Sequence, residues 1–204
     1  MKTLFMAALM AAISSATLAG ENFDAAAPGS LPADWICSLT GKGAPVWKVE
    51  TGLSAPSKPH VLKQSGNGDF PWCAYTSAAL ADGYVEVKFR PLGGEDDQAG
   101  GLMWRWKDGD NYYVARANAL ENNVSLYHMT KGKRRTIKYV DAPVALNAWH
   151  VLRVAFKGQN IKVFLDGVQY MDLDDDHIAG SGAVGVWTKA DSITEFDDFA
   201  FGTQ

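Results

Sequence analysis

The 204-residue chain has few histidines, few cysteines and few long apolar runs, and each shortage excludes a class of protein. Its four histidines show neither an H-E-x-x-H pattern nor the paired Cys/His spacing of a zinc site. It contains no G-x-S-x-G elbow and no phosphate-binding P-loop. The sequence therefore carries none of the signatures of zinc proteases, serine hydrolases or P-loop nucleotide-binding proteins.

Basic surface is also scarce. The formal net charge is -4, with 19 lysines and arginines against 23 aspartates and glutamates. No basic stripe is available to neutralise phosphates, so we expect no nucleic-acid partner. The single basic cluster, KGKRR at 131–135, surrounds a glycine, and we assign it to a solvated hairpin tip.

Long apolar segments are confined to the N-terminus. Residues 1–20, MKTLFMAALMAAISSATLAG, combine an early Lys2, an apolar run and a tail of small residues. This pattern predicts a signal peptide cut after Ala19 or Gly20. Its apolar run is shorter than the roughly 20 residues of a membrane-spanning helix. We expect an exported protein, periplasmic or extracellular, whose mature part, 21–204, is one domain without a membrane span.

The two cysteines, Cys37 and Cys73, leave two alternatives open. In an oxidising compartment a disulfide between them would contribute roughly 3–4 kcal/mol to stability. The alternative is a pair of separately buried thiols. The spacing of the two residues does not decide between these.

Period-2 alternation dominates the rest of the chain and predicts β-strands. YVEVKFR places Val85 and Phe89 on one face and charged residues on the other. IKVFLDGVQYMDL predicts a hairpin folded at Asp166–Gly167, and GAVGVW and ITEFDDFAF are further strand patterns. Only 141–150 is expected to hold a short turn of helix. Many short strands with regular turns predict an all-β fold, a two-sheet antiparallel β-sandwich rather than a barrel.

Residues 100–123, GGLMWRWKDGDNYYVARANALENN, predict a hairpin that turns at Asp108–Gly109. The even number of loop residues decides which side chains share a face of the sheet. One face is uniformly apolar and belongs in the core; it carries Leu102, Trp104, Trp106, Tyr113, Ala115 and Ala117. The other is a polar outer face that carries Met103, Arg105, Tyr112, Val114, Arg116 and Asn118.

The polar outer face is the predicted ligand platform. Arginine and amide groups would bind sugar hydroxyls or a uronate carboxylate, and one aromatic ring would stack on the sugar. The loop NALENN and the strand end GVWTKAD add further polar groups. The predicted ligand-binding residues are Arg105, Tyr112, Arg116, Asn118, Glu121, Asn122, Trp187, Lys189 and Asp191. The alternatives are surface arginines that meet carboxylates and tyrosine, and a core position for Trp187.

Three segments, AGGLMWRWKDGDNYYVARANA, NAWHVLRVAFKGQNIKVFLDG and GAVGVWTKADSITEFDDFAFG, resemble the concanavalin A-like lectin/glucanase superfamily. More narrowly, they resemble laminin-G-like jelly rolls and the 3-keto-disaccharide hydrolase domain of secreted bacterial proteins. The resemblance covers essentially the whole of 21–204. It implies two antiparallel sheets, one of them concave, with ligands bound on the concave side or its rim loops.

The laminarinase-like glycosidases of this superfamily carry E-x-D-x-x-E on one strand, because a nucleophile and an acid/base must flank the glycosidic bond. Here Glu195-Phe196-Asp197 begins that pattern, but the third carboxylate would fall at Ala200. The motif is therefore absent. Glu121 and Asp191 are the first candidates for the catalytic carboxylate of a different glycosidase.

Calcium is the one cofactor that the resemblance makes relevant, since lectin-like and laminin-G-like sandwiches often bind it. The acidic run DLDDDH at 172–177 does not fit an EF-hand loop, and we expect it to be solvated. The candidate calcium ligands are Asp191 with Asp197 or Asp198. No other cofactor is expected.

Three functions remain as hypotheses. The leading one is a secreted, lectin-like protein that binds carbohydrate on its polar concave face. The first alternative is a glycoside hydrolase acting on 3-keto or otherwise modified disaccharides. The second is a structural or adhesion domain without a small ligand.

Overall fold

The computed structural model describes residues 19–203, so the expected signal peptide lies almost entirely outside the described residues. Within that range the chain forms fifteen strands and no helix. Residues 19–203 consequently offer no helix with the length and apolar character needed to cross a membrane.

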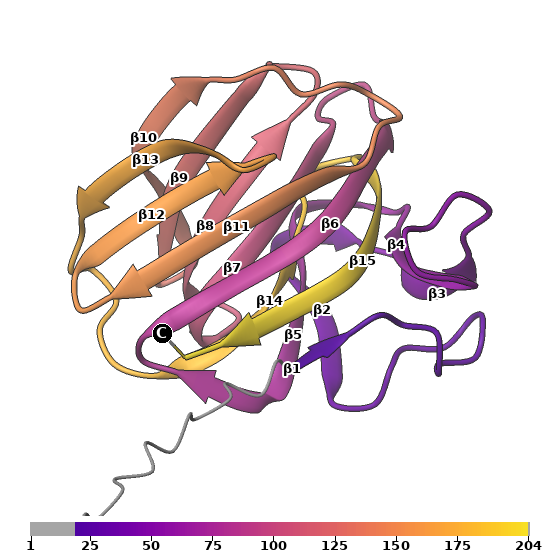
Figure 1. Cartoon of the computed structure of the whole chain (residues 1–204), viewed down its shortest axis with the longest axis horizontal. Coiled ribbons are helices and arrows are strands. Elements are labelled where there is room, and N and C mark those ends of the chain that lie inside the picture. Colours follow the sequence, from indigo (N-terminus) through magenta and orange to yellow (C-terminus); the bar gives the residue numbers. More distant parts are fainter. Residues whose placement is uncertain (1–18, 204) are drawn as a thin grey trace, which may run out of the picture.

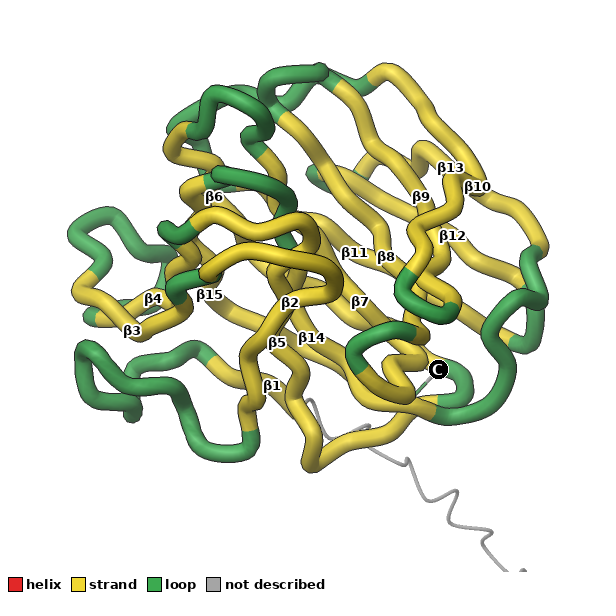
Figure 2. The backbone as a smooth tube through the Cα atoms, turned by 180° about the vertical axis from the view of Figure 1, so that it is seen from behind, coloured by secondary structure: helices red, strands yellow, loops and turns green. Residues whose placement is uncertain are grey.

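Two antiparallel sheets pack face to face (Figures 1 and 2). Sheet A contains β1 (Ala19–Glu21), β3 (Trp47–Thr51), β4 (His60–Gln64), β6 (Gly83–Gly93), β11 (His150–Lys157), β12 (Asn160–Leu165), β13 (Val168–Asp174) and β15 (Ile193–Gly202). Sheet B contains β2 (Trp35–Ala44), β5 (Asn67–Leu80), β7 (Ala99–Asp108), β8 (Asn111–Asn118), β9 (Asn123–Thr130), β10 (Lys133–Asp141) and β14 (Gly182–Trp187). Sheet A has the order β13-β12-β11-β6-β15-β4-β3, with β1 beside β15, and sheet B the order β10-β9-β8-β7-β14-β5-β2.

The core lies between the sheets and follows from the alternation in the sequence. Val85 and Phe89 of β6 are fully buried, in one apolar cluster with Trp104 of the other sheet. Trp104 stacks on Tyr113 and Phe156, with 5.2 and 5.9 Å between ring centroids. Each large apolar side chain buried in this way contributes about 1.5–3 kcal/mol. The predicted all-β sandwich is confirmed.

One local prediction is confirmed as well, and one open alternative is decided. The Asp166–Gly167 turn joins β12 to β13. Cys37 and Cys73 lie directly opposite each other on β2 and β5 and form a disulfide.

The short turn of helix expected within 141–150 is wrong. The backbone N–H groups of Ala142 and Val144 donate instead to the carbonyl and side-chain oxygens of Asn122, at 3.0 and 3.2 Å. Pro143 between them has no N–H to donate. These bonds tie residues 142–144 to Asn122, and residues 142–149 contain turns but no helix.

The outer face of sheet B is concave, as a single contact shows. Arg134 on β10 and Phe70 on β5 are separated by four intervening strands, which is about 24 Å across a flat sheet. The Arg134 guanidinium nevertheless lies 5.0 Å from the centre of the Phe70 ring. The sheet must therefore curl until its two sides approach each other. We call this surface the concave face.

A bulge in β7 interrupts the hairpin that the sequence predicts. The pairing is as expected up to Trp104, which lies opposite Tyr113. Arg105 then adopts a left-handed backbone conformation, with φ of 48°, and the register shifts before Asp108 is reached. Such a bulge changes the side of the sheet to which the following residues point.

The bulge reverses the predicted positions of Arg105 and Trp106. Trp106 packs on the concave face against Trp72, with 5.4 Å between the rings, and not in the core between the sheets. Arg105 turns away from the concave face and lies over the Phe156 ring at 5.6 Å. Its guanidinium donates hydrogen bonds to the carbonyls of Ala81, Gly158 and Ile178. Both sequence-based placements are therefore wrong.

Candidate functional site

The concave face is filled by its own aromatic side chains. Phe70 stacks on Trp187, with 6.0 Å between the ring centroids. Arg134 lies between Phe70 and Tyr127, 5.0 and 4.5 Å from their centres. Trp187 and Tyr112 are completely buried. These two predicted ligand residues therefore form the floor of the concave face and not an open platform.

A buried charge network lies beside this aromatic cluster. Its centre is Asp97, which belongs to the loop between β6 and β7 and is completely buried. Asn118 donates a hydrogen bond to the Asp97 carboxylate at 2.6 Å, and Arg116 donates to it at 3.4 Å. Lys189, from the loop after β14, forms an ion pair with the same carboxylate. Two cations and an amide thus compensate one buried negative charge, which alone would be costly to bury.

Arg116 connects this network to the loop before β9. Its side chain is only 1% exposed. One terminal nitrogen donates to Glu121 and, at 3.2 Å, to Asn123. Asn123 also donates to Glu121 at 2.9 Å, and the Glu121 side chain stays 40% exposed. Arg116 is therefore a buried residue that orients an exposed carboxylate, rather than a ligand contact itself.

Asp191 shapes the loop that carries Asp97. Its carboxylate accepts hydrogen bonds from the backbone N–H groups of Glu95, Asp96 and Asp97, at 2.6, 3.1 and 3.1 Å. Burial opposes its charge, but these donors outweigh that effect and lower the pKa of Asp191 below its ordinary value. Gly94 opens the loop with φ of 137°, and a Cβ atom there would lie 1.9 Å from the Asp97 carbonyl oxygen. The loop is thus held in one conformation.

An open hollow of about 450 Å³, the rim hollow, lies where these elements meet. Phe70 gives it an aromatic wall, and Lys189 belongs both to its lining and to the buried network. A second hollow of about 500 Å³ shares Asn67 and reaches Asp191. The rim hollow is lined by Asn67, Gly68, Asp69, Phe70, Asp96, Lys189 and Ala190. One ring beside several polar groups is a common composition for a small-ligand site.

The structure brings some of the predicted ligand residues together and separates others. Arg116, Asn118, Glu121, Lys189 and Asp191 all lie around Asp97 and its loop. Asn122 instead accepts a hydrogen bond from the segment after β10, and the bulge places Arg105 on the other side of the sheet.

Sequence reasoning missed Asp97, Asp96 and Phe70. The available signal was the acidic loop GGEDDQ at 93–98, between two strands. Of its carboxylates, Glu95 and Asp96 are exposed and Asp97 is buried, a difference that composition does not show. Phe70 lies on the concave face, whereas an aromatic residue in a strand is normally assigned to the core.

The two catalytic candidates do not form a glycosidase pair. Burial opposes the charge of Glu121, but hydrogen bonds from Asn123 and the charge of Arg116 outweigh it and lower its pKa. The pKa of Asp191 is lowered too. A glycosidase needs one carboxyl group whose pKa is raised, so that it can donate a proton. The surroundings of Glu121 and Asp191 thus favour permanent negative charge rather than proton transfer.

The candidate calcium ligands do not converge either. Asp191 is occupied by backbone donors, Asp197 accepts from the backbone and hydroxyl of Ser57 at 2.8 and 2.7 Å, and Asp198 pairs with Lys88 at 2.7 Å. Within residues 19–203 no three histidine, cysteine or carboxylate side chains are grouped so that they could hold a metal. Calcium binding stays a prediction without an assembled site.

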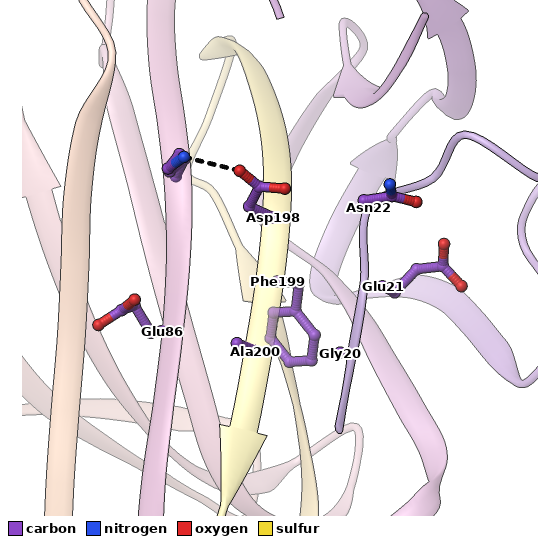
Figure 3. A pocket seen from close by; sticks show the side chains of 8 residues that line it. Gly20, Glu21, Asn22, Glu86, Asp198, Phe199 and Ala200 are labelled. Atoms are coloured by element: carbon purple, nitrogen blue, oxygen red, sulfur yellow. Dashed lines mark hydrogen bonds and ion pairs between the residues drawn. The ribbon is translucent and has the colours of Figure 1, made fainter. Parts of the chain in front are cut away.

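A further hollow, of about 520 Å³, lies on the outer face of sheet A beside β1 (Figure 3). Glu86 and Asp198 line it from β6 and β15, and Lys88 pairs with Asp198. Glu86 is paired in turn with Arg153 at 3.0 Å. Because these charges are compensated within the sheet and the Phe199 ring is buried, this hollow offers a ligand less than the rim hollow does.

This architecture is similar to that of several known proteins. No family model matches the chain. Carbohydrate binding module CBM66 from Bacillus subtilis covers 83% of this chain and 96% of its own, with a TM-score of 0.66 and 21% sequence identity. A prokaryotic β-1,3-1,4-glucanase (lichenase) derived from a mouse hindgut metagenome covers 92% of this chain and 100% of its own, with a TM-score of 0.60 and 14% identity. The fold is the concanavalin A-like jelly roll.

One curated relative of this jelly roll is the levanase of Bacillus subtilis (strain 168). The two are 24% identical over 155 residues, which is 75% of this chain and 22% of the levanase. The jelly roll therefore matches only about a fifth of that relative's length. In the jelly roll described here, the rim hollow lies at the edge of the concave face, where the resemblance to lectins and glucanases led us to expect a ligand.

Proposed function

We propose that the protein binds carbohydrate in the rim hollow at the edge of its concave face. The observation that carries this proposal is the meeting of an aromatic wall with a rigid charged network. Phe70 lines the hollow, and Lys189 links the hollow to the buried Asp97. An aromatic ring can cover the C–H surface of a sugar while neighbouring polar groups bind its hydroxyls.

Each side chain has a distinct role in this proposal. Asp69 and Asp96 would accept hydrogen bonds from sugar hydroxyls, and Asn67 can donate and accept them. Asp97, Arg116 and their partners would act from behind, since they hold the loops that carry these groups. A site whose loops are already fixed loses less conformational entropy when it binds.

The similar proteins support the same proposal, because they include a carbohydrate binding module, a glucanase and a levanase. The predicted signal peptide fits it too, since polysaccharides too large to enter a cell are met outside the cytoplasm. For the hydrolase alternative, the pKa values of the two candidate carboxylates, Glu121 and Asp191, are lowered, whereas an acid catalyst needs a raised one. Binding is therefore the function that we propose.

A glycan array followed by calorimetric titration tests the proposal. The array identifies the glycan that binds most strongly, and titration then compares the wild type with Phe70→Ala. We expect the variant to bind about tenfold more weakly or worse, because the stacking surface is lost. Phe164→Ala is the matched control, since Phe164 is a half-buried phenylalanine of sheet A. No binding to any glycan, or equal loss in both variants, would contradict the proposal.

A further inference from the structure

Arg134 is a cation on the concave face that has no partner of opposite charge among residues 19–203. Its guanidinium lies between the rings of Tyr127 and Phe70, at 4.5 and 5.0 Å from their centres. Nη1 is buried and has no hydrogen-bond acceptor in the described part of the chain. An aromatic sandwich of this kind stabilises and partly dehydrates a guanidinium, but it does not neutralise the charge.

The other arginines are matched or exposed. Arg90, Arg116 and Arg153 pair with the carboxylates of Glu195, Asp97 and Glu86. Arg105 donates to backbone carbonyls. Arg135 is exposed to solvent. Among residues 19–203, Arg134 is therefore the half-buried arginine whose side chain has neither an ion pair nor a hydrogen bond.

Most charges near Arg134 are positive, and the Asp110 carboxylate lies beside Gly132 at the hairpin tip. Arg116 approaches the same Tyr127 ring, at 5.7 Å from its centre. Lys131, Lys133 and Arg135 belong to the same hairpin and are exposed. The carboxylates of Asp97 and Glu121 are already bound by Arg116. Asp69 and Asp96 are the acidic groups that line the rim hollow itself.

Phe70 connects Arg134 to the rim hollow, because this residue lines the hollow and its ring contacts the guanidinium. A sugar stacked on Phe70 would therefore carry its substituents toward Arg134. A planar guanidinium fixed between two rings presents its N–H donors in a set direction, which suits a carboxylate or sulfate.

We propose that the ligand of the rim hollow is an acidic glycan, and that its carboxylate or sulfate group pairs with Arg134. This inference rests on the proposed carbohydrate-binding function. The hydroxyl-binding carboxylates Asp69 and Asp96 would then face neutral parts of the glycan, and Arg134 would face its acidic substituent. Within the cluster KGKRR, Arg134 thereby gains a role beyond that of a solvated tip residue.

Matched pairs of glycans test the inference. An array would carry uronate oligosaccharides beside their carboxyl-reduced forms, and sulfated chains beside their unsulfated forms. We expect the wild type to bind the acidic member of a pair at least about tenfold more tightly than the neutral member. The affinity for the acidic member should fall as the salt concentration rises. A difference within the uronate pairs would indicate a carboxylate ligand, and a difference within the sulfated pairs would indicate a sulfate.

Arg134→Met and Arg134→Lys assign the effect to the residue. Arg134→Met should lose the preference for the acidic member and keep its affinity for the neutral one, whereas Arg134→Lys should retain part of the preference. Arg135→Met, at the exposed neighbour, should behave as the wild type. Circular dichroism and thermal unfolding confirm that each variant is folded.

The outcomes separate the two proposals. Equal binding of both members of every pair, or an equal loss of both in Arg134→Met, overturns the acidic-glycan inference and leaves carbohydrate binding standing, with Arg134 as a wall residue. Binding to no glycan of either kind overturns the proposed function and this inference together.

Discussion

Asp97 is the residue on which the conformation of the candidate site depends most. Asn118, Arg116 and Lys189 all converge on its carboxylate, from β8 and from the loop after β14. In Asp97→Ala the buried Arg116 guanidinium would lose the Asp97 carboxylate and would stay shielded from water. We expect the free energy of unfolding to fall by about 3–5 kcal/mol, measured by urea denaturation.

Asp96→Ala is the matched control for that experiment. Asp96 is the exposed neighbour of Asp97, so its removal should change stability by no more than about 0.5 kcal/mol. An Asp97→Ala protein as stable as the Asp96→Ala protein would show that the network does not hold the loop.

Tyr112 provides a pH-dependent signal from the floor of the concave face. Burial raises its pKa to about 12, and its hydroxyl lies 2.6 Å from that of Thr40. In the unfolded chain a tyrosine loses its proton near pH 10, so the raised folded-state pKa stabilises the native state below about pH 10 and this stabilisation is lost as the pH rises toward 12.

Tyr112→Phe should therefore lose less stability than the wild type between about pH 10 and 12. Unfolding measured across that range, with the ultraviolet titration of the tyrosines alongside, checks this expectation. The same slope of stability against pH in both proteins would mean that Tyr112 ionises freely in the native state.

At the scale of the elements, the disulfide ties the edge strand β2 to β5. Cys37 and Cys73 are 36 residues apart, and closing a loop of that length restricts the unfolded chain by about 4 kcal/mol. The double variant Cys37→Ser/Cys73→Ser should lose stability of that order in denaturant unfolding. Reduced wild type should unfold like the double variant; a wild type that is unaffected by reduction would contradict this role.

The β7 bulge shows where strand alternation stops being a reliable guide. Parity correctly placed Leu102, Trp104 and Tyr113 in the core. It failed from the next residue, Arg105, whose left-handed conformation accompanies a shift of the register. No turn residue in the sequence marks that bulge. The Arg105 side chain donates its hydrogen bonds to carbonyl groups of loops distant in the sequence, and no local pattern shows these contacts.

For the whole molecule, the fold could be predicted because alternation and turn residues are local properties. The candidate site could be predicted only in part. Lys189, Asp191 and Glu121 were identified as polar loop residues, but their common partner network depends on Asp97. Loops 94–98 and 188–192 meet because β6 lies beside β15 in sheet A and β7 lies beside β14 in sheet B. A local sequence pattern does not encode that strand order. Arg134 looked like one more charge at a hairpin tip for the same reason.

The most direct test of carbohydrate binding at the rim hollow uses the seven tryptophans as position markers. Their indole ¹⁵N–¹H signals, assigned with single Trp→Phe variants, would be followed during titration with the glycan selected on the array. Trp187 stacks on Phe70, Trp104 lies in the core between the sheets, and Trp149 lies beside Arg90 of sheet A. We predict that the Trp187 signal shifts while those of Trp104 and Trp149 stay in place. A shift of Trp149 with Trp187 unchanged would contradict the site, because the glycan would then be bound on the other face of the molecule.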